Sequence, residues 1–251
     1  MLLISTGKIT APNGQGIVVE GVNSQYGKGL NDNLDNPDTM PAPLSDKVGS
    51  KNGAGGTPFL QCDGVNDCSD SLVQQWNLGD KNPNDKLFFR FNTTVPMGTF
   101  GYKFDFVFCS SETDPSYNDM FIAWQTDPSA DDPNSDPPVD PYTGNIVHIP
   151  DPNNPGKVLP PSVSTLGRYL DVSGYSGNEP QLAGTGFETR GCTGWLTAMG
   201  GVRPGAALTI GFFLSDMRDH AVATQVILDK FRWDCEGCDP GEVDDCGVQT
   251  P

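Results

Sequence analysis

The most constraining feature of this chain is a two-residue alternation of side-chain type between residues 100 and 108. Aromatic residues occupy every second position, and other residue types fill the positions between them, in the run Tyr102-Lys103-Phe104-Asp105-Phe106-Val107-Phe108. Successive side chains of a β-strand point to opposite faces of its sheet. The run therefore predicts a strand with one buried face.

Other short apolar runs, separated by turn residues, predict further strands. They cover residues 2–4, 17–19, 87–91, 120–124, 194–198, 208–214 and 222–233, with a hairpin formed by residues 145–149 and 158–159. The alternation slips near Asp229 and Lys230, which predicts a β-bulge there. Many short strands with turn signals between them are typical of an antiparallel β-sandwich of jelly-roll type.

Glycine and proline make up about a fifth of the 251 residues, with 30 and 22 copies, and only 36% of residues are apolar. We therefore expect an all-β fold with long loops rich in Gly, Asn, Asp and Pro. The predicted sandwich domain covers residues 1–234, with its longest loops at 21–58 and 127–165. Residues 235–251 are predicted to be a cysteine-containing acidic tail or linker.

The formal charge of −17 disfavours phosphate-rich and anionic partners. We therefore expect no binding to nucleic acid. Divalent cations would gain most from such a surface, although acidity also keeps exported proteins soluble. No segment is long and apolar enough to insert into a membrane, and the first residues lack the basic start of a signal peptide.

The seven cysteines indicate disulfide bonds and therefore an extracellular or cell-surface location. Cys109 and Cys192 are candidates for a link between distant strands. The odd count leaves one thiol unpaired or paired beyond this sequence. A zinc site is poorly supported, because the chain has only two histidines. The remaining candidates form a close pair and a cluster near the C-terminus: Cys62, Cys68, Cys235, Cys238 and Cys246.

Acidic and amide side chains follow two of the predicted strands. Glu112, Asn118 and Asp119 occupy one such corner, and Asp216 and Asp219 occupy the other. If the two strand ends meet, these oxygens could bind Ca²⁺, which takes six to eight oxygen ligands in forgiving geometry. The alternative is that they cap turns and face solvent.

A second acidic loop contains Asp63 and Asp67 with ligand-like spacing. It does not match the EF-hand pattern. Asp and Asn beside Gly are also ordinary turn residues, so this second calcium prediction has a plain structural alternative.

The chain contains none of the common catalytic motifs, and we expect that it is not an enzyme. Glycoside hydrolysis needs two facing carboxylates, which a chain with 32 acidic residues offers by chance. A carbohydrate-binding module would need exposed Trp or Tyr rings. Trp76 is expected to be the most exposed tryptophan, and Trp124, Trp195 and Trp233 are expected in the core. The tyrosine candidates are Tyr117, Tyr142, Tyr169 and Tyr175.

Several motifs together resemble the choice-of-anchor L family. They occur in order over roughly residues 2 to 233, and include Ile4-Ser5-Thr6-Gly7, Tyr117-Asn118-Asp119-Met120-Phe121 and Gly194-Trp195-x-Thr197-Ala198. The resemblance implies a bacterial secreted or surface-displayed β domain, usually part of a longer chain with a C-terminal sorting signal. This chain departs from the family in its longer loops, in the absence of strand-forming sequence before Ile4, and in its cysteine-containing tail.

These observations predict a non-enzymatic, calcium-stabilised β-sandwich that serves adhesion or matrix assembly at a bacterial surface. Its ligand would be a surface glycan or protein. A carbohydrate-binding module is the first alternative. Self-association into a surface structure is the second, since free strand edges would permit it.

Overall fold

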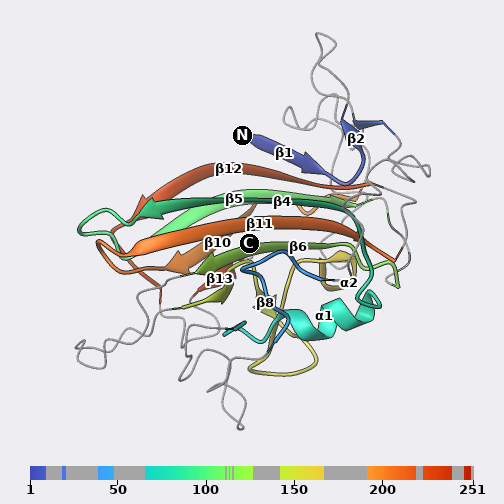
Figure 1. Ribbon diagram of the computed structural model, residues 1–251, viewed down its shortest axis with the longest axis horizontal. Helices are drawn as coiled ribbons and strands as arrows, with labels where there is room; N and C mark the ends of the chain where they lie inside the picture. Colours follow the sequence, from blue (N-terminus) through green and yellow to red (C-terminus); the bar gives the residue numbers. More distant parts are fainter. Residues whose placement is uncertain are drawn as a thin grey trace.

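The computed structural model describes residues 1–9, 19–20, 39–47, 66–110, 112, 114, 116–126, 142–166, 191–218, 223–238 and 246–249. The described chain is mostly β-strand, and its strands pair antiparallel in sheets that pack as a sandwich (Figure 1). The predicted all-β sandwich is thereby confirmed, while the jelly-roll connectivity stays a prediction.

The two main sheets have five and four strands within the described residues. The five-stranded sheet runs in the order β1 (Leu2–Ser5), β12 (Thr224–Asp234), β5 (Gly101–Ser110), β10 (Leu196–Gly201) and β13 (Gly247–Gln249). The four-stranded sheet runs in the order β4 (Pro83–Thr94), β11 (Ala207–Met217), β6 (Met120–Thr126) and β7 (Gly144–Asn145). Two small hairpins pair β2 (Lys8–Ile9) with β3 (Val19–Glu20), and β8 (Ile149–Pro150) with β9 (Val158–Leu159).

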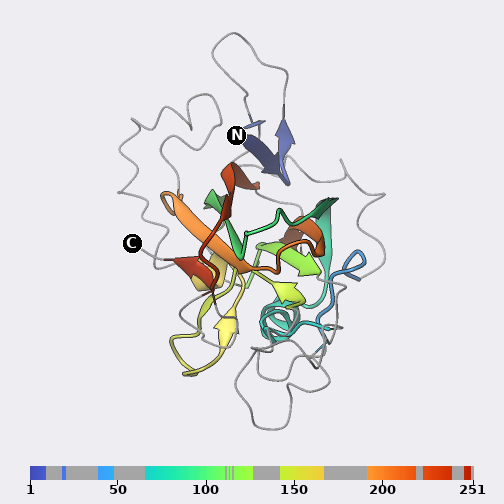
Figure 2. The same ribbon diagram turned by 90° about the vertical axis from the view of Figure 1, so that its left-hand side faces the viewer.

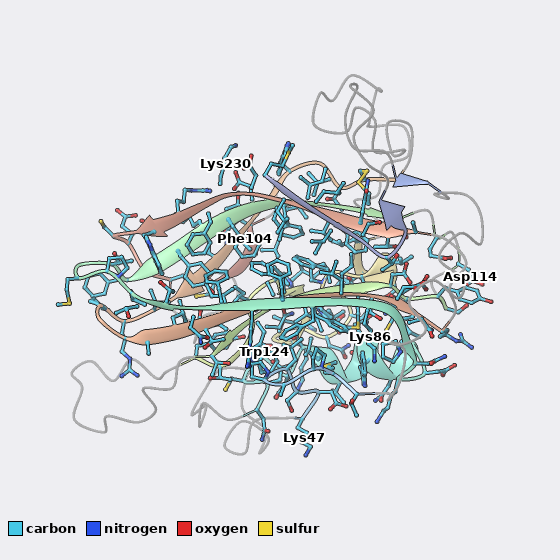
Figure 3. All side chains as sticks on the ribbon, turned by 45° about the horizontal axis from the view of Figure 1, so that its top comes forward. Lys47, Lys86, Phe104, Asp114, Trp124 and Lys230 are labelled. Carbon is cyan, nitrogen blue, oxygen red and sulfur yellow. A yellow bond between two sulfur atoms is a disulfide. The ribbon has the colours of Figure 1, made fainter. Side chains whose placement is uncertain are left out.

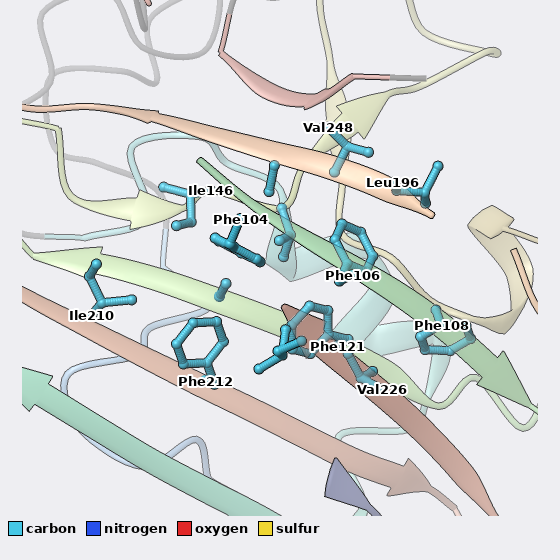
Figure 4. Packing of buried hydrophobic residues seen from close by; sticks show 14 of the residues in the cluster. Phe104, Phe106, Phe108, Phe121, Ile146, Leu196, Ile210, Phe212, Val226 and Val248 are labelled. Atoms are coloured by element: carbon cyan, nitrogen blue, oxygen red, sulfur yellow. The ribbon is translucent and has the colours of Figure 1, made fainter. Parts of the chain in front are cut away.

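The main core lies between the two sheets and is rich in phenylalanine. Phe104 and Phe106 of β5 face Phe121 of β6 and Phe212 of β11 (Figure 4). The Phe104 and Phe212 ring centroids are 5.5 Å apart and the rings meet edge to face, and the Phe106 and Phe121 centroids are also 5.5 Å apart. The alternation in the sequence thus places one aromatic ladder of β5 inside the sandwich.

The second face of β5 is also buried, so the prediction of a single buried face was incomplete. Val107 and Cys109 lie on this outer face with Ile227 and Cys192. The Cys109–Cys192 disulfide links β5 to the segment before β10. A disulfide and a small apolar cluster therefore cover a face that the alternation alone would leave to solvent.

Two short helices accompany the sheets. Helix α1 (Leu72–Leu78) packs Trp76 against the outer face of the four-stranded sheet, where it meets Phe213 and Trp124. Helix α2 (Val163–Leu166) follows the β8–β9 hairpin. Figure 2 views the sandwich from one end, with the blue N-terminal strands at the top and α1 near the bottom.

The structure confirms several local predictions. β8 and β9 form the hairpin expected from residues 145–149 and 158–159. The pairing of β12 with β5 shifts register between Asp229 and Arg232, and Lys230 has a φ of 51°, so the predicted bulge is present. By contrast, part of the segment predicted to be a tail or linker forms β13, which pairs with β10 in the five-stranded sheet.

The two flanks of the sandwich differ. On one flank, the Val248 N–H of β13 donates to the His148 carbonyl just after β7, at 2.9 Å. This bond ties the edge of one sheet to the segment beside the edge of the other. On the opposite flank, β1 and β4 each end their sheet. That flank carries the groove described below.

Candidate functional site

The predicted acidic corners do meet at one end of the sandwich. Thr224 at the start of β12 pairs with Ser110 at the end of β5, and Met120 at the start of β6 pairs with Ser215 of β11. The strand ends that bear the two corners therefore lie together. The described side chains form hydrogen bonds there.

Asp119 is fully buried and accepts hydrogen bonds from both sheets. Its Oδ1 accepts the Met217 N–H of β11 at 3.0 Å, and its Oδ2 accepts the Thr224 hydroxyl of β12. The same hydroxyl lies 2.8 Å from Ser110 Oγ. The carboxylate is therefore a hydrogen-bonded link between the sheets.

Asn118, also fully buried, connects the two helices. Its Nδ2 donates to Gln75 Oε1 of α1 at 2.7 Å, and its Oδ1 accepts the Ser164 N–H of α2 at 3.0 Å. The hydroxyls of Ser162 and Ser164 donate to the same Gln75 oxygen. Through these bonds Asn118 holds α1 and α2 together.

The remaining members of the predicted set lie around this corner. Asp216 is 1% exposed and lies opposite Asn84 of β4, beside a register shift in β11. Glu112 is half-buried, and its N–H donates to Ser110 Oγ at 3.0 Å. Asp219 lies outside the described residues.

The calcium site stays a prediction, because Asp219 of the proposed ligand set lies outside the described residues. No group of three His, Cys, Asp or Glu side chains within the described part of the chain is close enough to hold a metal ion. Both carboxylate oxygens of Asp119 already accept bonds from protein donors. The calcium prediction is thus left without a described ligand set.

Asp67 organises the start of α1. Its carboxylate accepts the N–H groups of Ser69 at 3.2 Å and Leu72 at 3.0 Å, and the Ser71 hydroxyl at 3.3 Å. Leu72 is the first helical residue, whose amide has no partner within the helix. Burial raises the pKa of Asp67, and these hydrogen bonds partly offset that rise. Asp67 therefore serves as a local cap, and Asp63 lies outside the described residues.

The cysteines form disulfides in the described chain. Cys109 pairs with Cys192, as predicted, and Cys238 pairs with Cys246. Cys68 is also disulfide-bonded, and Cys62 lies outside the described residues. Cys235 is the exposed free thiol among the cysteines that the structure describes.

The aromatic candidates for sugar stacking are mostly buried. Trp76 is 2% exposed, so the prediction that it is the most exposed tryptophan was wrong. Trp124 is fully buried as predicted, and Tyr142 is 5% exposed. Tyr117 is half-buried beneath the Arg218 guanidinium, which lies 5.7 Å from its ring centroid. Tyr169 and Tyr175 lie outside the described residues.

A groove that the sequence did not reveal opens between β4 and the strands β1 and β12. It encloses about 270 Å³, with Phe104 and Phe212 at its base and Phe91 and Phe231 at its mouth. The Phe91 and Phe231 rings meet edge to face with centroids 6.1 Å apart. The other lining residues are Met1, Leu2, Phe89, Leu228, Asp229 and Lys230. In Figure 3, β4 runs across the front with Lys86 near one end, Lys230 marks the β12 side, and Phe104 lies between them.

The fold and groove define a disulfide-bonded, antiparallel β-sandwich with one apolar flank. No family model, curated protein or solved structure matches this chain. No helix in the described ranges is long and apolar enough to cross a membrane.

Proposed function

We propose that this chain is a non-enzymatic β-sandwich binding domain that acts outside the cell or on a bacterial surface, in adhesion or surface-matrix assembly. The phenylalanine-lined groove carries the proposal. Eight of its ten lining side chains are apolar, and only Asp229 and Lys230 are charged. Such a lining suits the burial of apolar groups from a partner better than acid–base chemistry.

Further exposed apolar side chains lie in the turn after β4; together with the groove they are called here the apolar flank. Among the described residues, seven large hydrophobic side chains are exposed, and six of them come from β1 and the residue before it, from β4, from β12 or from the turn after β4. The six are Met1, Leu2, Phe91, Met97, Phe100 and Phe231. The seventh, Leu78, is on α1. A concentration of this kind on one side is typical of an interaction surface.

The disulfides support the proposed location. Disulfides persist in oxidising surroundings and are rare in the cytosol. The Cys109–Cys192 bond links β5 to the segment before β10, and the Cys238–Cys246 bond links the segment after β12 to the residue before β13. The resemblance to a family of bacterial surface proteins points the same way.

The carbohydrate-binding alternative has weaker support. Sugars stack on exposed Trp and Tyr rings, whereas Trp76, Trp124 and Tyr142 are buried. The exposed rings of the apolar flank are phenylalanines. Calcium stays a prediction, and Asp63 and Asp219 of the proposed ligands lie outside the described residues.

The test is co-sedimentation of the labelled, non-reduced chain with a bacterial cell-envelope fraction. Phe91→Ser combined with Phe231→Ser is expected to lose most of the bound fraction, because both rings form the mouth of the groove. Leu78→Ser is the matched control, because Leu78 is equally exposed but lies on α1. Equal sedimentation of the unmodified chain, the double variant and the Leu78→Ser variant would overturn the proposal, and so would the absence of any sedimentation. Circular dichroism confirms that the variants are folded.

A further inference from the structure

We infer that the partner of the apolar flank is a second copy of this chain, paired antiparallel along β4 about Phe91. The inference rests on the proposed function, since it names the partner for that surface.

The Leu87–Thr94 part of β4 is an edge strand with little of the usual protection. β4 runs from Pro83 to Thr94, and its only described neighbour in the sheet is β11. From Leu87 to Thr94 its pairing with β11 is continuous, with no bulge and no proline, and Arg90 is its only charged residue. Edge strands normally carry charges, prolines or bulges that prevent pairing with another chain. A regular strand with a free row of backbone N–H and C=O groups is a template for such pairing.

The charge distribution favours this strand over the rest of the surface. Two copies that each carry a charge of −17 repel one another. Residues 86–104 contain no acidic residue, although the chain has 32, and they include Lys86, Arg90 and Lys103. This stretch comprises most of β4, the turn with Met97 and Phe100, and the start of β5. The Leu87–Thr94 part of β4 therefore brings no carboxylate of its own to a contact between two copies.

Two copies of β4 can pair antiparallel with Phe91 at the centre of the register. In that register Arg90 lies opposite Asn92 of the second copy, and Phe89 lies opposite Thr93, so no like charges face each other. Phe91 lies opposite Phe91, an aromatic pair across the two-fold axis. Directly opposed residues in antiparallel strands have Cβ atoms about 4.5–5.5 Å apart.

The side chains that such pairing covers are the exposed ones. Leu87 and Phe89 pack toward the core between the sheets, whereas Phe88 packs on the α1 side, so alternate positions of β4 face inward. Phe91 continues the inward row and is 38% exposed at the mouth of the groove. A second β4 would place its own inward row beside Phe91 and Phe231. One two-fold symmetric contact would then pair the backbone groups of β4 in both copies and cover the groove of each copy.

Disulfide trapping tests the register. Phe91→Cys is made in a Cys235→Ser background, because Cys235 is an exposed thiol that would cross-link on its own. Mild oxidation is expected to convert most of this variant into a covalent dimer. Met97→Cys in the same background is the control, because its side chain is 83% exposed yet lies far from the two-fold axis. Equal cross-linking of both variants, or none at position 91, would overturn the inference.

Sedimentation velocity of the unmodified chain supplies an independent measure. The mass is expected to rise from 26.8 kDa toward twice that value between low and high micromolar concentration. Arg90→Glu keeps the strand but adds a negative charge to a segment that has no acidic residue. The protein concentration at which half of the chains are dimeric is expected to rise at least tenfold. A monomer at every concentration would overturn self-pairing, while envelope binding that still depends on Phe91 and Phe231 would leave the proposed function standing.

Discussion

Replacing Asp119 by alanine distinguishes a structural carboxylate from a metal ligand. The change removes the acceptor for the buried Met217 N–H and for the Thr224 hydroxyl. A buried donor left without a partner costs about 1–3 kcal/mol. The Thr224 hydroxyl can turn fully toward Ser110 Oγ at 2.8 Å, so most of the loss comes from the amide. We expect the free energy of unfolding to fall by about 3 kcal/mol, or roughly 6–12 °C in Tm.

The assay is urea unfolding of the non-reduced chain, followed by circular dichroism, once in EDTA and once in excess calcium. Hydrogen bonding predicts the same loss for Asp119→Ala in both solutions. Asp114→Ala is the control, since the exposed Asp114 carboxylate accepts a local bond from the Ser116 N–H, and little change is expected. If EDTA lowers the stability of the parent chain to that of Asp119→Ala, the carboxylate binds calcium and the reasoning is wrong.

Three further predictions concern covalent links, pH and calcium. Replacing Cys109 and Cys192 by alanine is expected to lower the free energy of unfolding by about 4–5 kcal/mol, and replacing Cys238 and Cys246 by about 2–3 kcal/mol. The difference arises because the two disulfides close loops with sequence separations of 83 and 8, and a longer loop loses more chain entropy. Urea unfolding that ranks the two variants in the opposite order would contradict this. Burial lowers the pKa of His148 from 6.5 to about 3, so between these values the unfolded chain binds a proton that the folded chain does not, and stability should fall by about 1.4 kcal/mol per pH unit below 6.5. A His148→Gln variant with an unchanged slope over that window would refute the assignment. If calcium binds outside the described residues, Tm after EDTA treatment rises with calcium but not with magnesium, and the absence of a rise removes calcium from the proposal.

Much of the strand framework could be predicted because period-two alternation survives wherever one face of a strand meets the main core. β5 is the clearest case, since Tyr102, Phe104, Phe106 and Phe108 all enter the core between the sheets. The slip in alternation near Lys230 located the β12 bulge for the same reason. Local pattern is sufficient when the neighbouring strand only has to supply an apolar surface.

Helix α1 and the burial of Trp76 could not be predicted in this way. The helix has seven residues, which is too short for a clear helical period. It forms where Asp67 satisfies its first amide, and Trp76 is buried because Phe213 and Trp124 supply an outer apolar face. Those contacts join residues far apart in the sequence, which a local pattern cannot show.

The acidic corner shows the same limit in its chemistry. Counting oxygens near strand ends could not show whether the two corners meet, and the structure brings them together. Nor could the count show which donors would face those oxygens. The donors to Asp119 are 98 and 105 residues away in the sequence, at Met217 and Thr224. A carboxylate that meets buried N–H and O–H groups serves as an acceptor, and only the tertiary fold decides this.

The difference between the two flanks argues that the open groove is a specific feature and not a consequence of sandwich architecture. The same two sheets are joined on the far flank, where Val248 donates to the His148 carbonyl and both residues are buried. On the near flank, the chain places Phe91 and Phe231 at the edge and leaves each more than a third exposed. A β-sandwich gains nothing in solubility from exposed rings beside a regular strand edge. Pairing with β4 of a second copy would cover the exposed rings and the strand edge in one contact. The cross-linking test at Phe91 therefore examines both features at once.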